Sequence, residues 1–444
     1  MVIVFFCNFA GENFLNMKQI QNIVDYLLEW LLDSKDLASQ VVYSDNPDEY
    51  KGKRLAIVPS DFFSNNVYLT QESLVKKVKY YLQFRGWIDG MEDNKYIPVL
   101  LGTDQIVEQD GCIVLHADII ASTFYLLTRY EELVNPVRDE YGRFPAKESF
   151  LARVGMLHYP IVDEYSDYLR SLLGIEPRRR KLQKIFLTHD VDTVAFYRHL
   201  RGFAGGIKRF EFRAAVKAQK GLVDDAAYTF PWLIENDSRI TNAEQIYFLK
   251  AGIKSEGFDY PMYDLQGADV QQLLLLLANN NISIGLHCSY ASGANSSLIS
   301  DEKNRLQQVV GKTIKRTRYH YLRTCSVDDY QALADIGVAE DFTMGFAQLA
   351  GFRLGTCRPV RWINPRTLEV TNLVLHHLTA MDCSLSDYMK LDADDSFRYV
   401  RDLIEQAAYH GGEISLLWHN SVFAHQTWQK DIYLRLLAYL KTIQ

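Results

Sequence analysis

Short apolar runs and helical patterns alternate along the second part of the chain, from about residue 181 onward. The strand candidates are KIFLTHD, AEQIYFLKAG, NISIGLH, TIKRTRYHY, GVAEDFT and GEISLLWHN. The helix candidates are ADVQQLLLLLANN, SVDDYQALADIG, SFRYVRDLIEQAAYH and TLEVTNLVLHHLTA. Repeated strand–helix units imply parallel strands, so we expect an α/β fold, either a doubly wound sheet or a barrel.

The first part of the chain shows a similar alternation on a smaller scale. VIVFF, YIPVLLG and CIVLHADI are typical of strands, while QIQNIVDYLLEWLL, IIASTFYLLTRYEELV and VDEYSDYLRSLL are typical of helices. DEYGRFPAKES has the punctuation of a structured loop. The basic, proline-containing stretch GIEPRRRKLQK is the best linker. We therefore expect an N-terminal α/β domain over residues 1–180 and a second domain over residues 181–444.

Composition narrows the class of protein. A chain of 444 residues exceeds what one core usually serves, and 48% hydrophobic content is enough to build cores for two domains. The net charge of −7 gives no sign of a nucleic-acid-binding surface, which would need clustered basic residues. The six cysteines are scattered, which argues against a disulfide framework and a cysteine zinc site.

Two sequence features bear on whether the protein is soluble or bound to a membrane. The longest leucine run is far short of the roughly 20 apolar residues that span a bilayer. The N-terminus lacks the basic segment and the cleavage site of a signal peptide. We expect a soluble, cytoplasmic protein without a transmembrane segment; the sequence does not indicate an oligomeric state.

Polar side chains follow the expected strands at their C-terminal ends. The residues are His189, Asp190 and Asp192 after KIFLT, His287 in NISIGLH, Arg318, His320 and Tyr321 in TRYHYLR, Asp341 in VAEDFT, and His419 in ISLLWHN. Because parallel strands end at one rim of their sheet, we expect these side chains to converge on a single site.

The motif THDVD has three interpretations: a cap for the next helix, a salt bridge to an arginine, or part of a metal site. Along a strand, Asp190 and Asp192 share one face, while His189 and Val191 point the other way. Two carboxylates on one face repel unless a proton or a cation lies between them. A divalent metal on Asp192, with Asp190 beside it as a base, resolves that repulsion. His287 suits a second ligand, since zinc binds imidazole nitrogen and carboxylate oxygen.

The motifs LTHDVD, IGLHCSY, TRYHYLR, DFTMGF with GFRLGTCRP, and LLWHN occur in this order along the chain. They resemble the motifs of the polysaccharide deacetylases, the NodB-like family of metal-dependent carbohydrate esterases. The resemblance covers roughly residues 180–444, and the first part, through ASTFYLLTRYEE and YGRFPAKES, resembles an N-terminal domain often joined to such a module. It implies a distorted (β/α) barrel that removes N- or O-acetyl groups from sugars with one divalent ion, zinc or a similar metal.

Carried over to this chain, the resemblance implies roles for the strand-end residues. Asp190 would be the catalytic base, and Asp192 and His287 would be metal ligands. Arg318 would hold the base, and Asp341 would support Arg318.

On the other side of the site, the backbone near Tyr321 would help to bind the oxyanion, and His419 would be the general acid. The unperturbed pKa of histidine, about 6.5, suits that proton transfer. Trp418 and neighbouring aromatic residues would wall the cleft, unless they belong to the core.

The sequence departs from the family pattern at the second motif, which usually carries two histidines four residues apart. The second position is Ala291 here, and alanine cannot bind a metal. Catalytic zinc sites normally keep three protein ligands. His320, at a position where the common pattern has proline, is the candidate third ligand; the alternative is a histidine that contacts substrate or is structural. Val191 separates two aspartates that are adjacent in the common pattern, and some relatives share this spacing.

Together these features predict a metal-dependent hydrolase that removes acetyl groups from a sugar or glycan precursor, with N-acetyl groups favoured over O-acetyl groups as its substrate. A water activated by the metal would be the nucleophile. Ala291 favours one alternative, a deacetylase-like module that has lost its metal and binds glycan or a protein partner. A second alternative is hydrolysis of another C–N bond, such as that of a cyclic amide.

Overall fold

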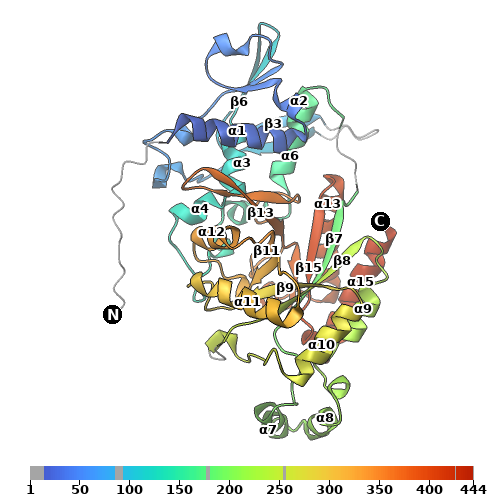
Figure 1. Ribbon diagram of the computed structural model, residues 1–444. Helices are drawn as coiled ribbons and strands as arrows, with labels where there is room; N and C mark the ends of the chain where they lie inside the picture. Colours follow the sequence, from blue (N-terminus) through green and yellow to red (C-terminus); the bar gives the residue numbers. More distant parts are fainter. Residues whose placement is uncertain (1–14, 86–93, 177–180, 254–256, 426, 444) are drawn as a thin grey trace.

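The computed structural model describes residues 15–85, 94–176, 181–253, 257–425 and 427–443 (Figure 1). The expected strand VIVFF and the expected boundary near residue 180 lie outside these residues. The chain forms a mixed α/β structure with a small N-terminal sheet and a large C-terminal sheet.

The N-terminal part contains a four-stranded sheet in the order β1-β2-β6-β5 and a separate β3–β4 hairpin. The pairs β1–β2 and β2–β6 are parallel, while β5 runs antiparallel to β6. The strands are β1 (Val41–Tyr43), β2 (Leu55–Ile57), β3 (Tyr80–Arg85), β4 (Asn94–Val99), β5 (Gly102–Gln109) and β6 (Cys112–Ala117). The helices are α1 (Met17–Leu32), α2 (Lys35–Ala38), α3 (Ile119–Leu127), α4 (Tyr130–Val134), α5 (Phe150–Arg153) and α6 (Ile161–Leu172).

The C-terminal part contains a nine-stranded sheet in the order β12-β13-β11-β10-β9-β8-β7-β15-β14. Its neighbours are parallel apart from the antiparallel pair β12–β13. The strands are β7 (Lys184–Val191), β8 (Ala243–Lys250), β9 (Ser283–Cys288), β10 (Arg316–Tyr319), β11 (Glu340–Met344), β12 (Val360–Asn364), β13 (Glu369–His377), β14 (Ala380–Met381) and β15 (Glu413–Leu417). The helices are α7 (Leu200–Lys208), α8 (Phe212–Ala218), α9 (Phe230–Asp237), α10 (Ala268–Asn279), α11 (Ser297–Val310), α12 (Asp328–Asp335), α13 (Ala393–Tyr409), α14 (Val422–His425) and α15 (Thr427–Thr442).

The large sheet curls strongly. Arg318 of β10 is three strands away from Asp190 of β7, and a flat sheet would separate them by about 14 Å. However, Nη1 of Arg318 lies only 2.9 Å from Oδ1 of Asp190, so the sheet bends around these side chains. A second contact brings distant strands of the sheet together: the N–H of Thr379, just after β13, donates to the carbonyl of Ser415 in β15 over 2.9 Å. The described strands therefore form a curled half-barrel.

One hydrophobic core runs through both parts of the chain. In α1, the side chains of Ile23, Leu27 and Leu31 recur every four residues and are buried on one face. This helix packs on β13 (Figure 1). Nε1 of Trp30 donates to the carbonyl of Pro359, just before β12, over 3.1 Å. The N-terminal part thus covers one edge of the large sheet.

The stretch TLEVTNLVLHHLTA forms a strand, β13, and the expectation of a helix is wrong. Its β-branched residues, including Val370 and Val374, favour an extended backbone. Leu373 and Leu375 are both buried, which is the period of two expected for one face of a strand. An apolar run of this length fits both the helix period of about 3.6 residues and the strand period of two. Pairing with β11 and β12 therefore determined that the stretch is a strand.

His410, which follows α13, is buried between two carboxylates of α6 and connects the two parts. Its Nδ1 lies 2.8 Å from Oδ2 of Asp167, and its Nε2 lies 3.0 Å from Oε1 of Glu164. Burial lowers the pKa of His410, but these hydrogen bonds outweigh burial and raise the pKa to about 9. Further charged groups nearby are Lys95, which pairs with Glu164, and Asp163, which pairs with Arg358.

This pKa shift predicts pH-dependent stability. The pKa of His410 is about 6.5 in the unfolded chain and about 9 in the fold, so its stabilising effect is complete below pH 6.5 and is lost as the pH rises through 9. The contribution is on the order of 3 kcal/mol. We expect the free energy of unfolding, measured by urea denaturation, to fall between about pH 6.5 and pH 9.5. The fall should be about 3 kcal/mol larger in the native chain than in His410→Gln, because the variant lacks the titrating imidazole. An equal fall in both proteins would contradict the assignment.

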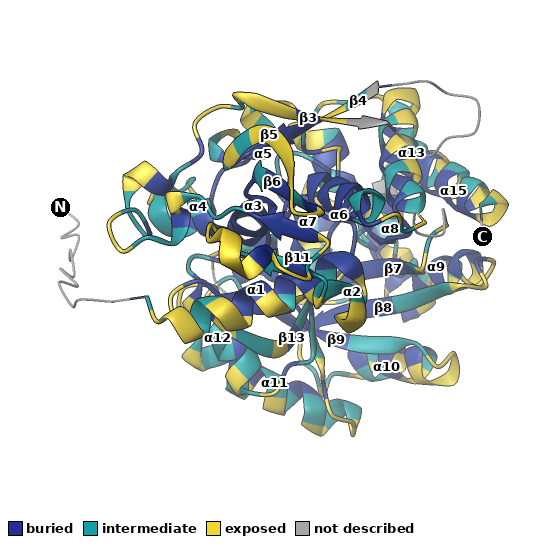
Figure 2. Ribbon diagram, turned by 90° about the horizontal axis from the view of Figure 1, so that it is seen from above, coloured by how far each residue is buried: buried dark blue, intermediate teal, exposed yellow. Residues whose placement is uncertain are grey.

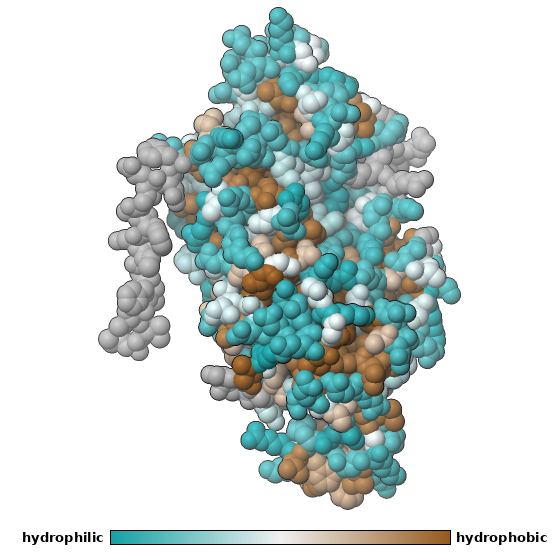
Figure 3. Space-filling view, in the orientation of Figure 1, coloured by the Kyte–Doolittle hydropathy of each residue, from teal (hydrophilic) through white to brown (hydrophobic). Residues whose placement is uncertain are grey.

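Buried residues concentrate in the two sheets and on the inward faces of the helices (Figure 2). Helices α7 and α8 form the lower tip of the molecule in Figure 1, where Figure 3 shows apolar side chains at the surface. Leu200 and Phe210 are 90% and 96% exposed there. Within the described ranges, no helix has the length and apolar character needed to cross a membrane.

Candidate metal centre

A pocket of about 400 Å³ opens where the parallel strands of the large sheet end. Its lining includes several residues expected from the sequence: Asp190, Asp192, His287, His320, Tyr321 and His419. Residues far apart in the chain meet here because the strands that carry them are neighbours in the curled sheet.

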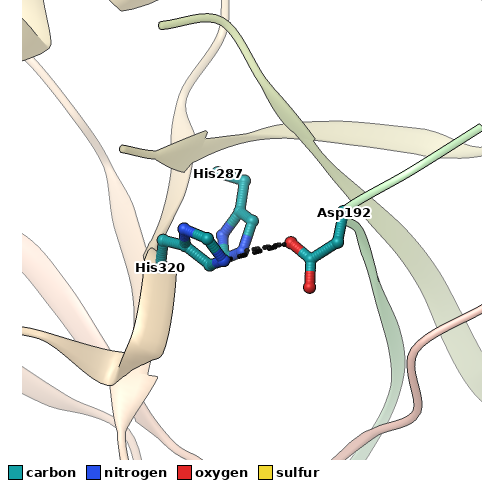
Figure 4. Close-up of side chains that lie close together, drawn as sticks. All are labelled: Asp192, His287 and His320. Atoms are coloured by element: carbon teal, nitrogen blue, oxygen red, sulfur yellow. Dashed lines mark ion pairs between the residues drawn. The ribbon is translucent and has the colours of Figure 1, made fainter. Parts of the chain in front are cut away.

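Strand register explains how the two histidines meet. His287 of β9 lies in register with Lys250 of β8 on one side and Arg318 of β10 on the other. His320 follows the last residue of β10, so it lies one step further along the neighbouring strand. Asp192 follows β7 and faces both imidazoles (Figure 4).

The three side chains have the spacing of a metal-ligand group. Oδ1 of Asp192 lies 3.5 Å from Nε2 of His287 and 3.3 Å from Nε2 of His320. Ligand atoms at about 2.1 Å from a tetrahedral zinc ion lie about 3.4 Å from one another. The donor atoms of Asp192, His287 and His320 all fall within 4.8 Å of each other. Their spacing is therefore compatible with one bound divalent ion.

The hydrogen bonds around this group leave its donor atoms available. Oδ1 of Asp192 and Nε2 of His287 are buried and have no hydrogen-bond partner among the described residues. Nδ1 of His287 donates to the carbonyl of Arg318 over 3.0 Å, so the neutral ring has its lone pair on Nε2. Nδ1 of His320 lies 3.2 Å from Oδ1 of Asp259, which orients that ring in the same manner. A cation would satisfy the buried atoms, so these residues fit a divalent metal.

Asp190 lies beside the ligand group as a second, ionised carboxylate. Its Oδ1 accepts a hydrogen bond from Nη1 of Arg318 over 2.9 Å, and its Oδ2 lies 3.6 Å from Nε2 of His287. Burial raises the pKa of Asp190, but the interactions with His287 and Arg318 outweigh burial and lower it. Arg318 is fixed by the carbonyl of Phe342 at 3.0 Å and by the ring of Phe248, 4.5 Å from its guanidinium carbon.

His419 also lies close to Asp192 and is held by Asp382. Nδ1 of His419 lies 2.9 Å from Oδ1 of Asp382, and the backbone N–H of His419 donates to Oδ2 over 2.7 Å. Nε2 of His419 therefore faces the pocket, 3.7 Å from Oδ2 of Asp192. Burial lowers the pKa of His419, but Asp382 outweighs burial and raises it well above the usual value. Asp382, Cys383 and His419 also have metal-ligand spacing, but the first and last are engaged with each other.

Two residues expected at the site have other surroundings. Trp418 is fully buried outside the pocket, where its indole N–H donates to Gln429 over 3.0 Å and its ring packs against Tyr433. Neighbouring residues at the end of a strand point to opposite sides, and His419 occupies the pocket side. Asp341 accepts hydrogen bonds from the hydroxyls of Thr317 and Thr343, at 2.8 and 3.0 Å, so its effect on Arg318 is coulombic.

Two carboxylates that were not expected from the sequence, Asp259 and Asp382, support the histidines. Asp382 follows the short strand β14, so the strand-end rule could have found it. Asp259 lies in the turn Gly257–Asp259, which carries no such signal. The N–H of Ala291 donates to Oδ2 of Asp259 over 3.1 Å. The position where the common pattern has its second histidine thus contacts the carboxylate that holds His320.

Residues 14–175 match the model of a family of unknown function, DUF7033. No curated protein matches the chain. A crystal structure of a provisionally assigned polysaccharide deacetylase from Mycobacterium smegmatis is similar, with 14% sequence identity and a TM-score of 0.38 over 57% of this chain and 84% of that chain.

Proposed function

We propose that the chain is a metal-dependent hydrolase that removes the acetyl group of an N-acetylated sugar or glycan precursor. The observation that carries the proposal is the group of Asp192, His287 and His320, with the carboxylate of Asp190 and the imidazole of His419 beside it. One aspartate and two histidines suit zinc, which prefers nitrogen and carboxylate ligands and needs an open position for catalysis.

An ion held by these three residues would polarise the acetyl carbonyl and make a nearby water more acidic. Asp190 accepts the proton as the water oxygen forms its bond to the acetyl carbon. Arg318 keeps Asp190 ionised and oriented for that transfer. Such a base typically accelerates a reaction by about 10²–10⁴-fold.

The leaving nitrogen needs a proton when its bond to the acetyl carbon breaks. His419 supplies that proton from Nε2, because Asp382 holds the ring by Nδ1 and turns Nε2 toward the pocket. The products are acetate and the free amine of the sugar. Asp190 lies beside His287 and His419 lies beside Asp192, so one residue can act as the base and the other as the acid.

The purified chain should bind one zinc-like ion and release acetate from N-acetylated sugars. Elemental analysis measures the metal content of the protein. An enzyme-coupled assay measures acetate release from a panel of N-acetylated and O-acetylated mono- and oligosaccharides. A chelator should abolish acetate release, and added Zn²⁺ should restore it. A chain that carries its metal but releases no acetate from the whole panel would contradict the proposal.

Lys250 favours a second candidate function, a binding module without metal. Its ammonium is buried, donates to the carbonyl of Pro261 over 2.8 Å and lies 3.9 Å from Oδ1 of Asp192. This charge could neutralise Asp192 in place of a metal ion. Binding of an acetylated glycan by a chain that takes up no Zn²⁺, with no acetate released, would support this candidate against the hydrolase.

A further inference from the structure

One wall of the pocket comes from the N-terminal part of the chain. Tyr141 and Arg143, which lie in the loop between α4 and α5, line the same pocket as the metal-ligand group. In sequence, helices α5 and α6 and strand β7 separate them from the nearest candidate ligand, Asp192. The large sheet does not enclose this pocket by itself.

Tyr141 ends a row of rings that begins at the metal-ligand group. The ring of His287 lies 4.9 Å from that of His320, and the ring of His320 lies 4.7 Å from that of Tyr321. Tyr321 lies 5.4 Å from Tyr141. Phe258 contacts both tyrosines, at 5.3 Å from Tyr141 and 5.2 Å from Tyr321. The pocket therefore has a polar end with the ligands and an aromatic end beside Tyr141.

The loop that carries Tyr141 is held on several sides. Arg323 and the hydroxyl of Tyr290 both donate to the carbonyl of Tyr141, over 2.7 and 3.1 Å. Asp139 accepts the N–H groups of Tyr141 and Arg143 over 3.0 and 2.9 Å, which closes the turn.

Glycine completes this turn. Gly142 has a φ of +79°, and a Cβ added there would lie 3.2 Å from the guanidinium of Arg323. Both the backbone conformation and the close approach favour glycine. The turn therefore presents Tyr141 in one orientation.

Arg143 connects the loop to the strand ends. Its Nε donates to Asp139 over 2.8 Å, and its Nη1 donates to the carbonyl of Tyr321 over 3.1 Å. Tyr321 has a φ of 60°, which is uncommon for a residue other than glycine. Arg143 thus supports the unusual backbone that places Tyr321 between the ligand group and Tyr141.

We propose that Tyr141, with Phe258 and Tyr321, forms a platform that binds a second sugar ring of the substrate, next to the ring that carries the acetyl group. A pyranose has an apolar face of C–H groups, which packs on aromatic rings while its hydroxyls remain at the edges. Because Tyr321 separates Tyr141 from the ligand group, a ligand that reaches both ends has more than one ring. The inference rests on the proposed deacetylase function and gives its substrate class, a short acetylated oligosaccharide.

The test compares chain lengths. For N-acetylglucosamine and its β-1,4-linked trimer, or the same pair of whichever acetylated sugar is hydrolysed, we expect Tyr141→Ala to lower the ratio of kcat/KM for trimer over monomer by about 10-fold, mainly through KM. Tyr141→Phe keeps the ring and should keep the ratio. Tyr159→Ala removes an exposed tyrosine of the same N-terminal part outside the pocket and is the matched control.

The outcomes separate this inference from the proposed function. Phe258→Ala is a second variant that should lower the same ratio, and it serves if Tyr141→Ala does not fold. Acetate release with an unchanged ratio in both variants would overturn the platform and leave the deacetylase intact. No acetate release from any sugar by the native, metal-loaded chain would instead contradict the function itself.

Discussion

Asp190→Asn is expected to lower acetate release by about 10²–10⁴-fold while the chain still binds one metal ion. The amide cannot accept the proton of the attacking water, whereas Asp192, His287 and His320 keep their donor atoms. The change also leaves Arg318 buried without its 2.9 Å carboxylate partner, so thermal unfolding should show some loss of stability.

The measurement is kcat/KM for the best substrate, together with metal content and the unfolding temperature. Asp301→Asn, an exposed carboxylate on α11, is the matched control and should leave all three unchanged. Full activity in folded Asp190→Asn would show that another group accepts the proton.

His320→Ala is expected to weaken zinc binding by about 100-fold or more, and with it acetate release at limiting metal. This variant tests the assignment of the metal site directly, because it removes one of the three donors and leaves only Asp192 and His287 to hold the ion. Asp259→Asn removes only the carboxylate that orients His320, at 3.2 Å, and should weaken binding by about 10-fold.

Titration with Zn²⁺ against a competing chelator gives the affinities, and His158→Ala, an exposed histidine of the N-terminal part, is the control. Native zinc affinity in His320→Ala would exclude this residue as a ligand. Zinc affinity that is equally low in the native chain would favour the module without metal, in which Lys250 lies close to Asp192.

Much of the fold was predictable because strands and helices have different apolar periods. The six C-terminal strand candidates correspond to β7, β8, β9, β10, β11 and β15. The error at β13 arose where an apolar run fits both periods and only pairing with neighbouring strands distinguishes them. The curl of the sheet was not predictable in the same manner, since it depends on the packing of many side chains at once.

The candidate site was predictable to the extent that its residues lie at strand ends. Asp190 and His287 lie near the ends of β7 and β9, Asp192, His320 and His419 follow strands, and all five line one pocket. The direction of each side chain was harder to predict near the point where a strand stops, which is why the sequence left Trp418 open between the cleft and the core.

The sequence alone determined an α/β chain whose strand ends carry carboxylates and histidines, because alternating periods and strand-end polarity are local properties. Only the tertiary structure decided which of these groups lie within ligand distance of one another. Asp259 supports His320 across 61 residues of sequence, and Asp382 supports His419 across 37. The tertiary structure also decided that Tyr141 lines the pocket. Such contacts depend on how a curled sheet and a separate N-terminal part pack together, and no local pattern in the chain encodes that packing.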